Sequence, residues 1–317
     1  MGHRVLAISK STNVRIIALG LTFVLGSDRH AAAQSAIALD LGEPARLAAT
    51  LSIQEGARLV ARGEWEKARR AFARAVAFDP DSAPAHFNLG VVLAALDRPD
   101  EAMAEYRQAL RIVPGMPEAL INLGVALFER QRSDEALTVL TRAVRAAPHN
   151  AAAHHNLGVV QSSLGRFDEA LASLTRAATI RPGDRTTVRA LAETHYNIGV
   201  TRARQQAWDE AIASYGRAAA LQPDFAQAFN AAGVAFQRLN RVDLALELFD
   251  EAVALSPSSV SASYNRALAL VALGRYSEAV TACRETLRGN PGQREILLLL
   301  DSVLRLLGGS PSPTASW

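Results

Sequence analysis

The sequence predicts an all-α protein built as a solenoid of antiparallel helix pairs. Three sets of residues recur with a period of 34 residues. Prolines form two such series, Pro80, Pro114, Pro148, Pro182 and then Pro223, Pro257, Pro291. A glycine and two alanines keep fixed places between the prolines. A fixed period of this length indicates helix–turn–helix units that stack on one another.

The markers identify the family that the chain resembles. The glycines are Gly56, Gly90, Gly124, Gly158, Gly199 and Gly233. The alanines are Ala68, Ala102, Ala136, Ala170, Ala211, Ala245 and Ala279, followed by Ala75, Ala109, Ala143, Ala177, Ala218 and Ala252. In this pattern the chain resembles the tetratricopeptide repeat (TPR) family, whose unit carries Leu-Gly, then Ala and an aromatic, then Pro. The resemblance covers about residues 49–291 and implies a right-handed superhelical solenoid of antiparallel helix pairs.

Residues 1–33 do not fit the repeat and have the composition of a signal peptide. Basic residues precede the apolar run Ile16–Gly26, and Ala31–Ala33 supplies the small residues of a cleavage site. The run is shorter than the roughly 20 residues that span a bilayer. We therefore expect cleavage before Gln34 and an exported, periplasmic protein. The alternatives are an inner-membrane anchor at residues 16–26 and a protein that is not exported.

Seven repeats follow a lead segment, residues 34–48, in which Glu43 and Pro44 suit a first helical turn. Small Gly and Ala residues let the two helices of a repeat approach closely, and a Leu or aromatic residue fills the adjacent space. An Asp-Glu pair opens several second helices, where carboxylates meet unpaired N–H groups. These pairs indicate helix starts, not catalytic dyads. The predicted repeats are 49–82, 83–116, 117–150, 151–184, 192–225, 226–259 and 260–293.

An insertion at residues 185–191 separates the fourth and fifth repeats. Seven residues are close to two helical turns, so the insertion keeps the helix faces in phase. One apolar-leaning stripe also continues through it: Val188, Leu191, His195, Ile198. We expect a lengthened helix from about Asp184 to Gln206. A loop is the alternative, because the adjacent Gly and Thr residues are poor helix formers.

Residues 294–307 are expected to form a helix that caps the last repeat, and residues 308–317 a disordered tail rich in Gly, Ser and Pro. A capping unit normally has a polar outer face. This one contains five consecutive apolar residues, so it has apolar surface available to a partner. We expect self-association as a homodimer, or docking on another protein, through Ile296, Leu297, Leu298, Leu300 and Leu304.

Composition argues against several classes of function. The formal charge of +3 comes from residues 1–33, and the remainder carries equal numbers of acidic and basic residues. A neutral chain gives no electrostatic reason to bind nucleic acid or an anionic membrane. A membrane is expected as a partner only if the N-terminal segment stays uncleaved. The single cysteine, Cys283, excludes an internal disulfide and is expected to be a small buried residue.

No motif for catalysis, a cofactor or a metal is present. His86, His154 and His195 share position 4 of their repeats, and His155 follows His154. None of these pairs has the i, i+4 spacing that metals favour. Phosphate-binding Gly-rich loops, nucleophile elbows and metalloprotease motifs are missing as well. We therefore expect a non-catalytic protein without a cofactor or metal.

One side of each first helix carries the candidate binding site. Positions 2, 5, 6, 9, 12 and 13 of the repeat share that side. The resemblance to TPR proteins implies that this side lines a concave groove, which binds extended peptides or partner helices. Position 6 is mostly Asn: Asn88, Asn122, Asn156, Asn197, Asn265. Position 5 is Phe87, Ile121, His155, Tyr196, Asn230 and Tyr264. Position 9 includes Val91, Val125, Val159 and Val200.

The asparagine series has two interpretations. An amide both donates and accepts hydrogen bonds, which suits the backbone of a bound peptide, and the neighbouring apolar side chains add sequence-tolerant contact area. Alternatively, each Asn bonds to a neighbouring repeat and orders the stack. TPR domains that bind chaperones use Lys at position 5 and Asn at position 9. Both positions differ here, so that form of acidic-tail recognition is not expected.

The resulting expectation is a scaffold or adaptor that binds a protein or peptide partner and takes part in assembling an envelope complex. A structural module that self-associates through its C-terminal cap is one alternative. The other is a scaffold for polysaccharide export, in which aromatic groove residues contact glycan.

Overall fold

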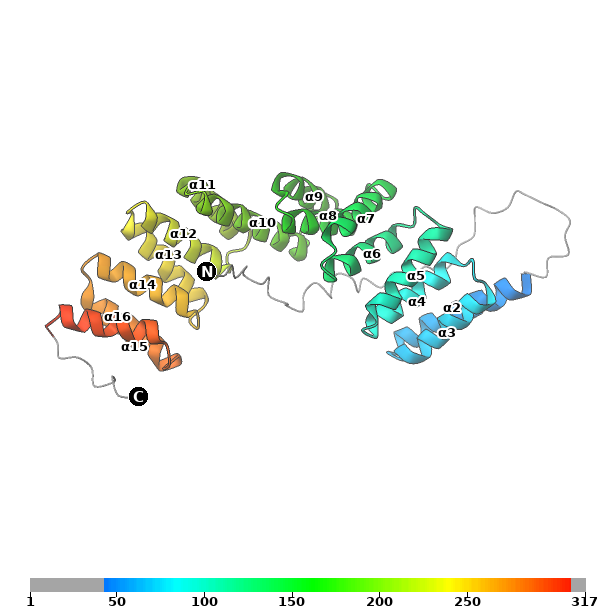
Figure 1. Cartoon of the computed structure of the whole chain (residues 1–317), viewed down its shortest axis with the longest axis horizontal. Coiled ribbons are helices and arrows are strands. Elements are labelled where there is room, and N and C mark those ends of the chain that lie inside the picture. Colours follow the sequence, from blue (N-terminus) through cyan, green and yellow to red (C-terminus); the bar gives the residue numbers. More distant parts are fainter. Residues whose placement is uncertain (1–42, 309–317) are drawn as a thin grey trace. The chain divides into compact units, whose positions relative to one another are not determined.

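The computed structural model describes residues 43–308, and all of their regular secondary structure is α-helical. The predictions for residues 1–33, residues 34–42 of the lead segment and residues 309–317 lie outside the described residues. Figure 1 shows the helices in chain order. They are α2 Glu43–Ala61, α3 Trp65–Phe78, α4 Ala83–Ala95, α5 Pro99–Ile112, α6 Pro117–Glu129, α7 Ser133–Ala146, α8 Ala151–Ser163, α9 Phe167–Ile180, α10 Arg185–Arg204, α11 Trp208–Leu221, α12 Ala226–Arg238, α13 Val242–Leu255, α14 Val260–Ala272, α15 Tyr276–Gly289 and α16 Arg294–Leu306.

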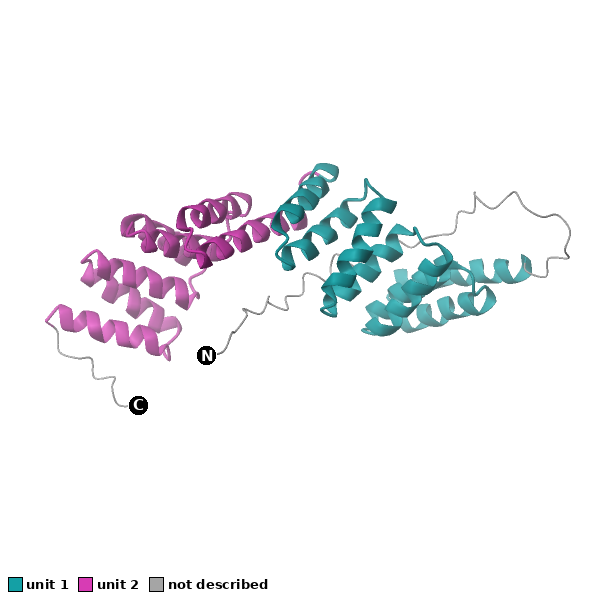
Figure 2. Cartoon of the chain, turned by 45° about the horizontal axis from the view of Figure 1, so that its top comes forward, with its two compact units in different colours: residues 1–181 teal, residues 182–317 magenta. Residues whose placement is uncertain are grey.

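The helices form two compact units, residues 1–181 and residues 182–317, coloured separately in Figure 2. Within the described residues, the first unit contains α2 to α9 and the second contains α10 to α16. In both units the most extensive contacts join the two helices of one repeat. The helix pair is therefore the unit of packing in each of them.

Two helix starts test the expectations for irregular segments. The seven inserted residues lie in α10, which begins at Arg185, so the insertion is helical and the loop alternative is wrong. Asp184 caps this helix by accepting a hydrogen bond from the Thr187 N–H at 3.1 Å. At the start of the described residues, α2 begins at Glu43 and so includes the last residues of the expected lead segment. Its first turn carries an acidic residue and a proline, both favourable at a helix start.

In six of the seven repeats, a glycine of the first helix packs against a large side chain of the second helix. A Cβ atom added to Gly124 would lie 2.5 Å from Cγ of Leu140. Added to Gly90, it would lie 2.6 Å from the ring of Tyr106. The same arrangement joins Gly56 to Phe72, Gly158 to Leu174, Gly199 to Tyr215 and Gly233 to Phe249. The absence of a side chain on the glycine therefore sets how closely the two helices approach.

Repeat seven uses a different pair of residues at the same two positions. Ala267 replaces the glycine, and Cys283 replaces the large side chain. Both residues are fully buried in one apolar cluster. The smaller second residue leaves room for the methyl group of the first, so the alanine does not overpack the contact between the two helices. The departure from the pattern thus preserves the packing, and it confirms that Cys283 is a small buried residue.

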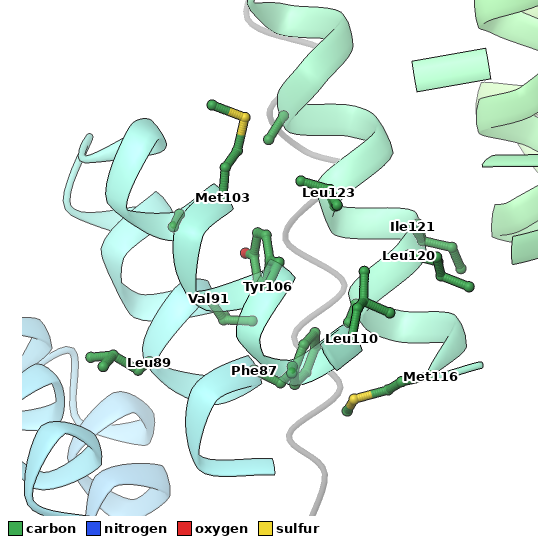
Figure 3. Packing of buried hydrophobic residues seen from close by; sticks show 14 of the residues in the cluster. Phe87, Leu89, Val91, Met103, Tyr106, Leu110, Met116, Leu120, Ile121 and Leu123 are labelled. Atoms are coloured by element: carbon green, nitrogen blue, oxygen red, sulfur yellow. The ribbon is translucent and has the colours of Figure 1, made fainter. Parts of the chain in front are cut away.

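Packing between repeats places large residues from successive pairs against one another. Figure 3 shows Tyr106 of α5 among Phe87 of α4 and the side chains of α6. The ring centroids of Phe87 and Tyr106 are 6.0 Å apart. Met116, the N-cap residue of α6, and Leu120 of α6 are buried in the same cluster. Each second helix therefore packs between two first helices.

We expect substitution of Gly124 by alanine to destabilise the protein. The added methyl group would overlap Leu140, and overpacking of this kind costs about 1–3 kcal/mol. Gly216 is the matched control, because it is also helical but has no atom within 4 Å of an added Cβ. Gly216→Ala should stabilise the protein by roughly 0.5–1 kcal/mol through helix propensity. Urea denaturation followed by circular dichroism measures both, and equal effects of the two substitutions would contradict the packing role of Gly124.

Candidate functional site

The first helices line one side of each unit. In the second unit α10 contacts α12, α12 contacts α14, and α14 contacts α16. In the first unit α2 contacts α4, and α6 contacts α8. Within residues 43–308, the second helices of successive repeats do not contact each other as extensively as these first helices do. Because the first helices are closer together than the second, their free side is the concave side of each unit.

In the first unit, most of the predicted groove residues are enclosed. All nine residues of α4 from Ala85 to Leu93 are buried, although successive residues of a helix point in different directions. The expectation of an open lining is therefore wrong for these side chains. The physical reason is that α4 and α6 are apolar on almost every side, as is typical of buried helices. The enclosed candidates are Phe87, Asn88, Val91, Ile121, Val125, His155 and Asn156.

Asn88 differs from its counterparts in α6 and α8. It is fully buried, and within residues 43–308 neither its amide nitrogen nor its amide oxygen has a hydrogen-bond partner. Half-buried Asn122 is hydrogen-bonded to the Tyr106 hydroxyl, and burial raises the pKa of that tyrosine while this bond opposes the shift. Asn156 Nδ2 donates to the carbonyl oxygen of Ala152 at 3.0 Å. Asn122 thus joins α6 to α5 of the preceding repeat, as expected of an amide that orders the stack.

In the second unit the same positions are more accessible. Asn197 is exposed, and Tyr196, Val200, Asn230 and Tyr264 are half-buried. Half-buried Asn122 of α6 and Val159 of α8 are the corresponding accessible residues of the first unit. The accessible candidate surface therefore lies mainly on α10, α12 and α14.

One hydrogen bond and two contacts between aromatic rings organise this accessible surface. Asn265 Nδ2 donates to Asn230 Oδ1 at 2.9 Å, which links α14 to α12. The Tyr196 ring lies 5.5 Å from that of Tyr215 and 5.3 Å from that of Phe225. Burial raises the pKa of Tyr196 and raises that of Tyr215 to about 12, so both remain neutral phenols near pH 7. Asn197 is the amide on this surface that remains exposed to a partner.

The predicted association surface of α16 does not form a single face. Ile296 and Leu300 are buried against repeat seven, so their assignment to an association surface is wrong. Their spacing of four residues places them on the side of the helix that covers the array. Leu297 and Leu304 are half-buried, whereas Leu298 is 58% exposed. Only Leu298 of the predicted set is fully available to another molecule.

The remaining polar clusters have structural explanations. The Asp-Glu pairs, among them Asp100-Glu101, Asp134-Glu135, Asp168-Glu169 and Asp209-Glu210, lie in the first turns of second helices. Arg132 donates to Glu135 at 2.6 Å, and this hydrogen bond lowers the pKa of the carboxyl. Burial raises the pKa of the Cys283 thiol to about 11, which leaves it protonated near pH 7. No group of three or more His, Cys, Asp or Glu residues in residues 43–308 could hold a metal ion.

The comparisons with known proteins agree with this geometry. The family model described as tetratricopeptide repeat matches residues 53–117, 121–185, 196–260 and 230–294. The chain belongs to the tetratricopeptide repeat family. The fold of this family is consistent with a role as a scaffold for protein–protein interactions. None of the helices in residues 43–308 has the length and apolar character needed to span a bilayer.

Individual relatives support the fold alone. A curated relative, the TPR repeat-containing thioredoxin TTL4 of Arabidopsis thaliana, is 37% identical over 85 residues, which are 27% of this chain and 12% of that protein. The C-terminal part of a TPR repeat-containing protein from Cytophaga hutchinsonii has a TM-score of 0.61 at 14% identity, covering 78% of this chain and 98% of that one. Pseudomonas aeruginosa pilF has a TM-score of 0.50 at 23% identity, covering 69% and 97%.

Sequence reasoning from positions 5, 6 and 9 missed part of the accessible surface. Positions 12 and 13 share the same side of the helix, and position 13 is arginine in two consecutive repeats, Arg204 and Arg238. Both are exposed. Following position 13 along the repeats, as was done for positions 5, 6 and 9, would have found them.

His86 and His195 both occupy position 4, and their pKa values should be shifted in opposite directions. The Nδ1 atom of His86 is 2.6 Å from Glu105, and its Nε2 atom is 3.0 Å from the Pro80 carbonyl oxygen. The hydrogen bond with Glu105 raises the pKa of His86, whereas burial lowers that of His195. Imidazole titration by NMR should place His86 above, and His195 below, the ordinary value of about 6.5.

The sign of the effect on stability follows from the raised pKa. The contribution of protonated His86 to the free energy of unfolding is fully present below about pH 6.5. It is lost as the pH rises through the folded-state pKa of His86. His86→Gln should remove that part of the pH dependence of unfolding, whereas His154→Gln, which loses only a bond to the Pro148 carbonyl, should retain it. An unchanged pH profile in His86→Gln would contradict the assignment.

Proposed function

We propose that this protein is a non-catalytic scaffold that binds an extended peptide or a partner helix on the concave side of its first helices. The partner is a protein, and the complex takes part in envelope assembly. The observation that carries the proposal is the accessible side of α10, α12 and α14, where amides alternate with apolar and aromatic side chains. Amides can bond to a peptide backbone, while Tyr and Val side chains supply contact area that tolerates different sequences.

Asn197 is the residue best placed for backbone recognition. It is exposed, whereas Asn265 and Asn230 are joined to each other and Asn88 is enclosed. Its neighbours Tyr196 and Val200 lie half-buried on the same helix side. A bound peptide would bury these apolar groups without leaving the Asn197 amide unpaired, because that amide could form hydrogen bonds with the peptide backbone.

Site-specific photo-crosslinking in cells tests this assignment. A photoreactive amino acid placed at Asn197 or Tyr264 should yield one discrete crosslinked protein, because both positions face the concave side. The same amino acid at Thr281, an exposed residue of the second helix α15, is the control and should yield none. Equal crosslinking from all three positions, or none from the first two, would contradict a concave binding site.

Self-association through α16 is the second candidate, because Leu298, Leu306 and Leu307 are 58%, 61% and 47% exposed. It makes a different prediction in the same experiment. A photoreactive amino acid at Leu298 would then crosslink to a second copy of this chain. A different protein crosslinked from Asn197 and Tyr264 would instead support the scaffold.

We also propose that the protein is exported and acts in the periplasm. This proposal rests on the basic, apolar and small-residue segments that succeed one another in residues 1–33. N-terminal sequencing of the protein isolated from cells should begin at Gln34. A protein that retains Met1 would contradict cleavage, and recovery of that form in the membrane fraction would support an anchor at residues 16–26.

A further inference from the structure

The concave side of the second unit changes in character from α10 to α16. Position 13 of successive first helices is Arg204, Arg238, Ala272 and Leu306. Position 5 of the same helices is Tyr196, Asn230, Tyr264 and Leu298. The helices follow one another in contact, so these two series run along the surface in the order of the chain. One end of the surface is therefore cationic, and the other is aliphatic.

The two arginines at the cationic end have no carboxylate partner in residues 43–308. Both are exposed, and they occupy the same position on two helices in contact. Nearby basic residues are engaged: Arg202 forms an ion pair with Glu210 at 3.1 Å, and Arg241 lies 5.0 Å from the centre of the Phe236 ring. Two unpaired guanidinium groups on adjacent helices favour an anionic group between them or beside them.

A structural explanation for these arginines is weaker. Arg204 and Arg238 are the last residues of their helices, where a cation interacts favourably with the helix dipole. The fold does not require a cation there, because the same helix end carries Ala95, Ser163 or Ala272 in other repeats. In α6 it carries Glu129, which has the opposite charge. The arginines are therefore specific to two adjacent repeats of the second unit.

The aliphatic end is available as well. Leu298 is 58% exposed and Leu306 is 61% exposed, and both belong to the concave positions of α16. They lie on a different side of the helix from Ile296, Leu300 and Val303, which are buried against repeat seven. Exposed leucines in line with a binding surface mark contact area for aliphatic side chains.

We propose that the concave side of the second unit selects a peptide with acidic side chains at one end and leucine-like side chains at the other. This proposal rests on the proposed function, because it assumes that a peptide binds on that side. The acidic side chains bind Arg204 and Arg238, and the aliphatic ones pack on Leu298 and Leu306. Neighbouring first helices lie roughly 10 Å apart, so the two ends are about 20–30 Å apart. An extended peptide of about ten residues spans that distance.

A library of random 12-residue peptides displayed on phage tests the proposal with the full chain as the target. Enriched peptides should combine Asp or Glu near one end with Leu, Ile or Phe near the other. Fluorescent synthetic copies of the enriched peptides should bind the double variant Arg204→Gln/Arg238→Gln about tenfold more weakly than the unaltered chain. The reason is that hydrogen bonds to a charged group contribute at least this factor to affinity. Raising the salt concentration should weaken binding to the unaltered chain more than binding to this variant.

The matched control is Arg217→Gln/Arg284→Gln. It removes the same charge from exposed positions on the second helices α11 and α15, away from the concave side. This variant should bind the peptides like the unaltered chain. An equal loss in both variants would show a general effect of net charge and would overturn the role of Arg204 and Arg238.

Two other outcomes separate this inference from the function on which it rests. In the first, the enriched peptides lack acidic residues, bind equally to the unaltered chain and to both arginine variants, and bind more weakly when Asn197 and Tyr264 are substituted. That outcome would overturn the charge preference and leave the concave binding site intact. A library from which the protein enriches no sequence would overturn both, since neither peptide binding nor its selectivity would remain.

Discussion

The structure depends on one steric constraint, the contact between a residue without a side chain in the first helix and a large side chain in the second. At Gly124 an added Cβ atom would be only 2.5 Å from Leu140. Because the same contact recurs along the chain, each pair has nearly the same geometry, and stacking identical pairs gives a regular array. Repeat seven shows that the constraint is steric. Ala267 is larger than the glycine of the other repeats, Cys283 is smaller than their large side chain, and both are buried.

This constraint uses only part of the first helix's surface. The glycine side faces the second helix, and another side faces the neighbouring repeat, which leaves the concave side free to vary. Variation is visible between the units. In the first unit α4 is buried from Ala85 to Leu93, whereas in the second Asn197 and Leu298 are exposed. Interaction properties can therefore differ along an array whose internal packing stays constant.

Similar residues at equivalent positions have different roles because their neighbours differ. His86 bonds to Glu105 and to the Pro80 carbonyl oxygen, while His195 has no acidic partner among the described residues and burial lowers its pKa. Asn265 bonds to Asn230, yet Asn88 is buried without a partner. A neighbouring residue from another helix decides in each case whether the polar group gains a hydrogen-bond partner.

The sequence by itself determined the helix pairs, their order and the phase of the insertion, because these follow from local periodicity and from small residues at fixed positions. It also predicted the glycine contacts and the buried Cys283. Tertiary structure alone decided which candidate residues are accessible. It enclosed Phe87 and Asn88, turned Ile296 and Leu300 inward and left Leu298 exposed. The physical reason is that periodicity defines the side of a helix on which a residue lies, whereas burial depends on the side chains that neighbouring helices bring against it.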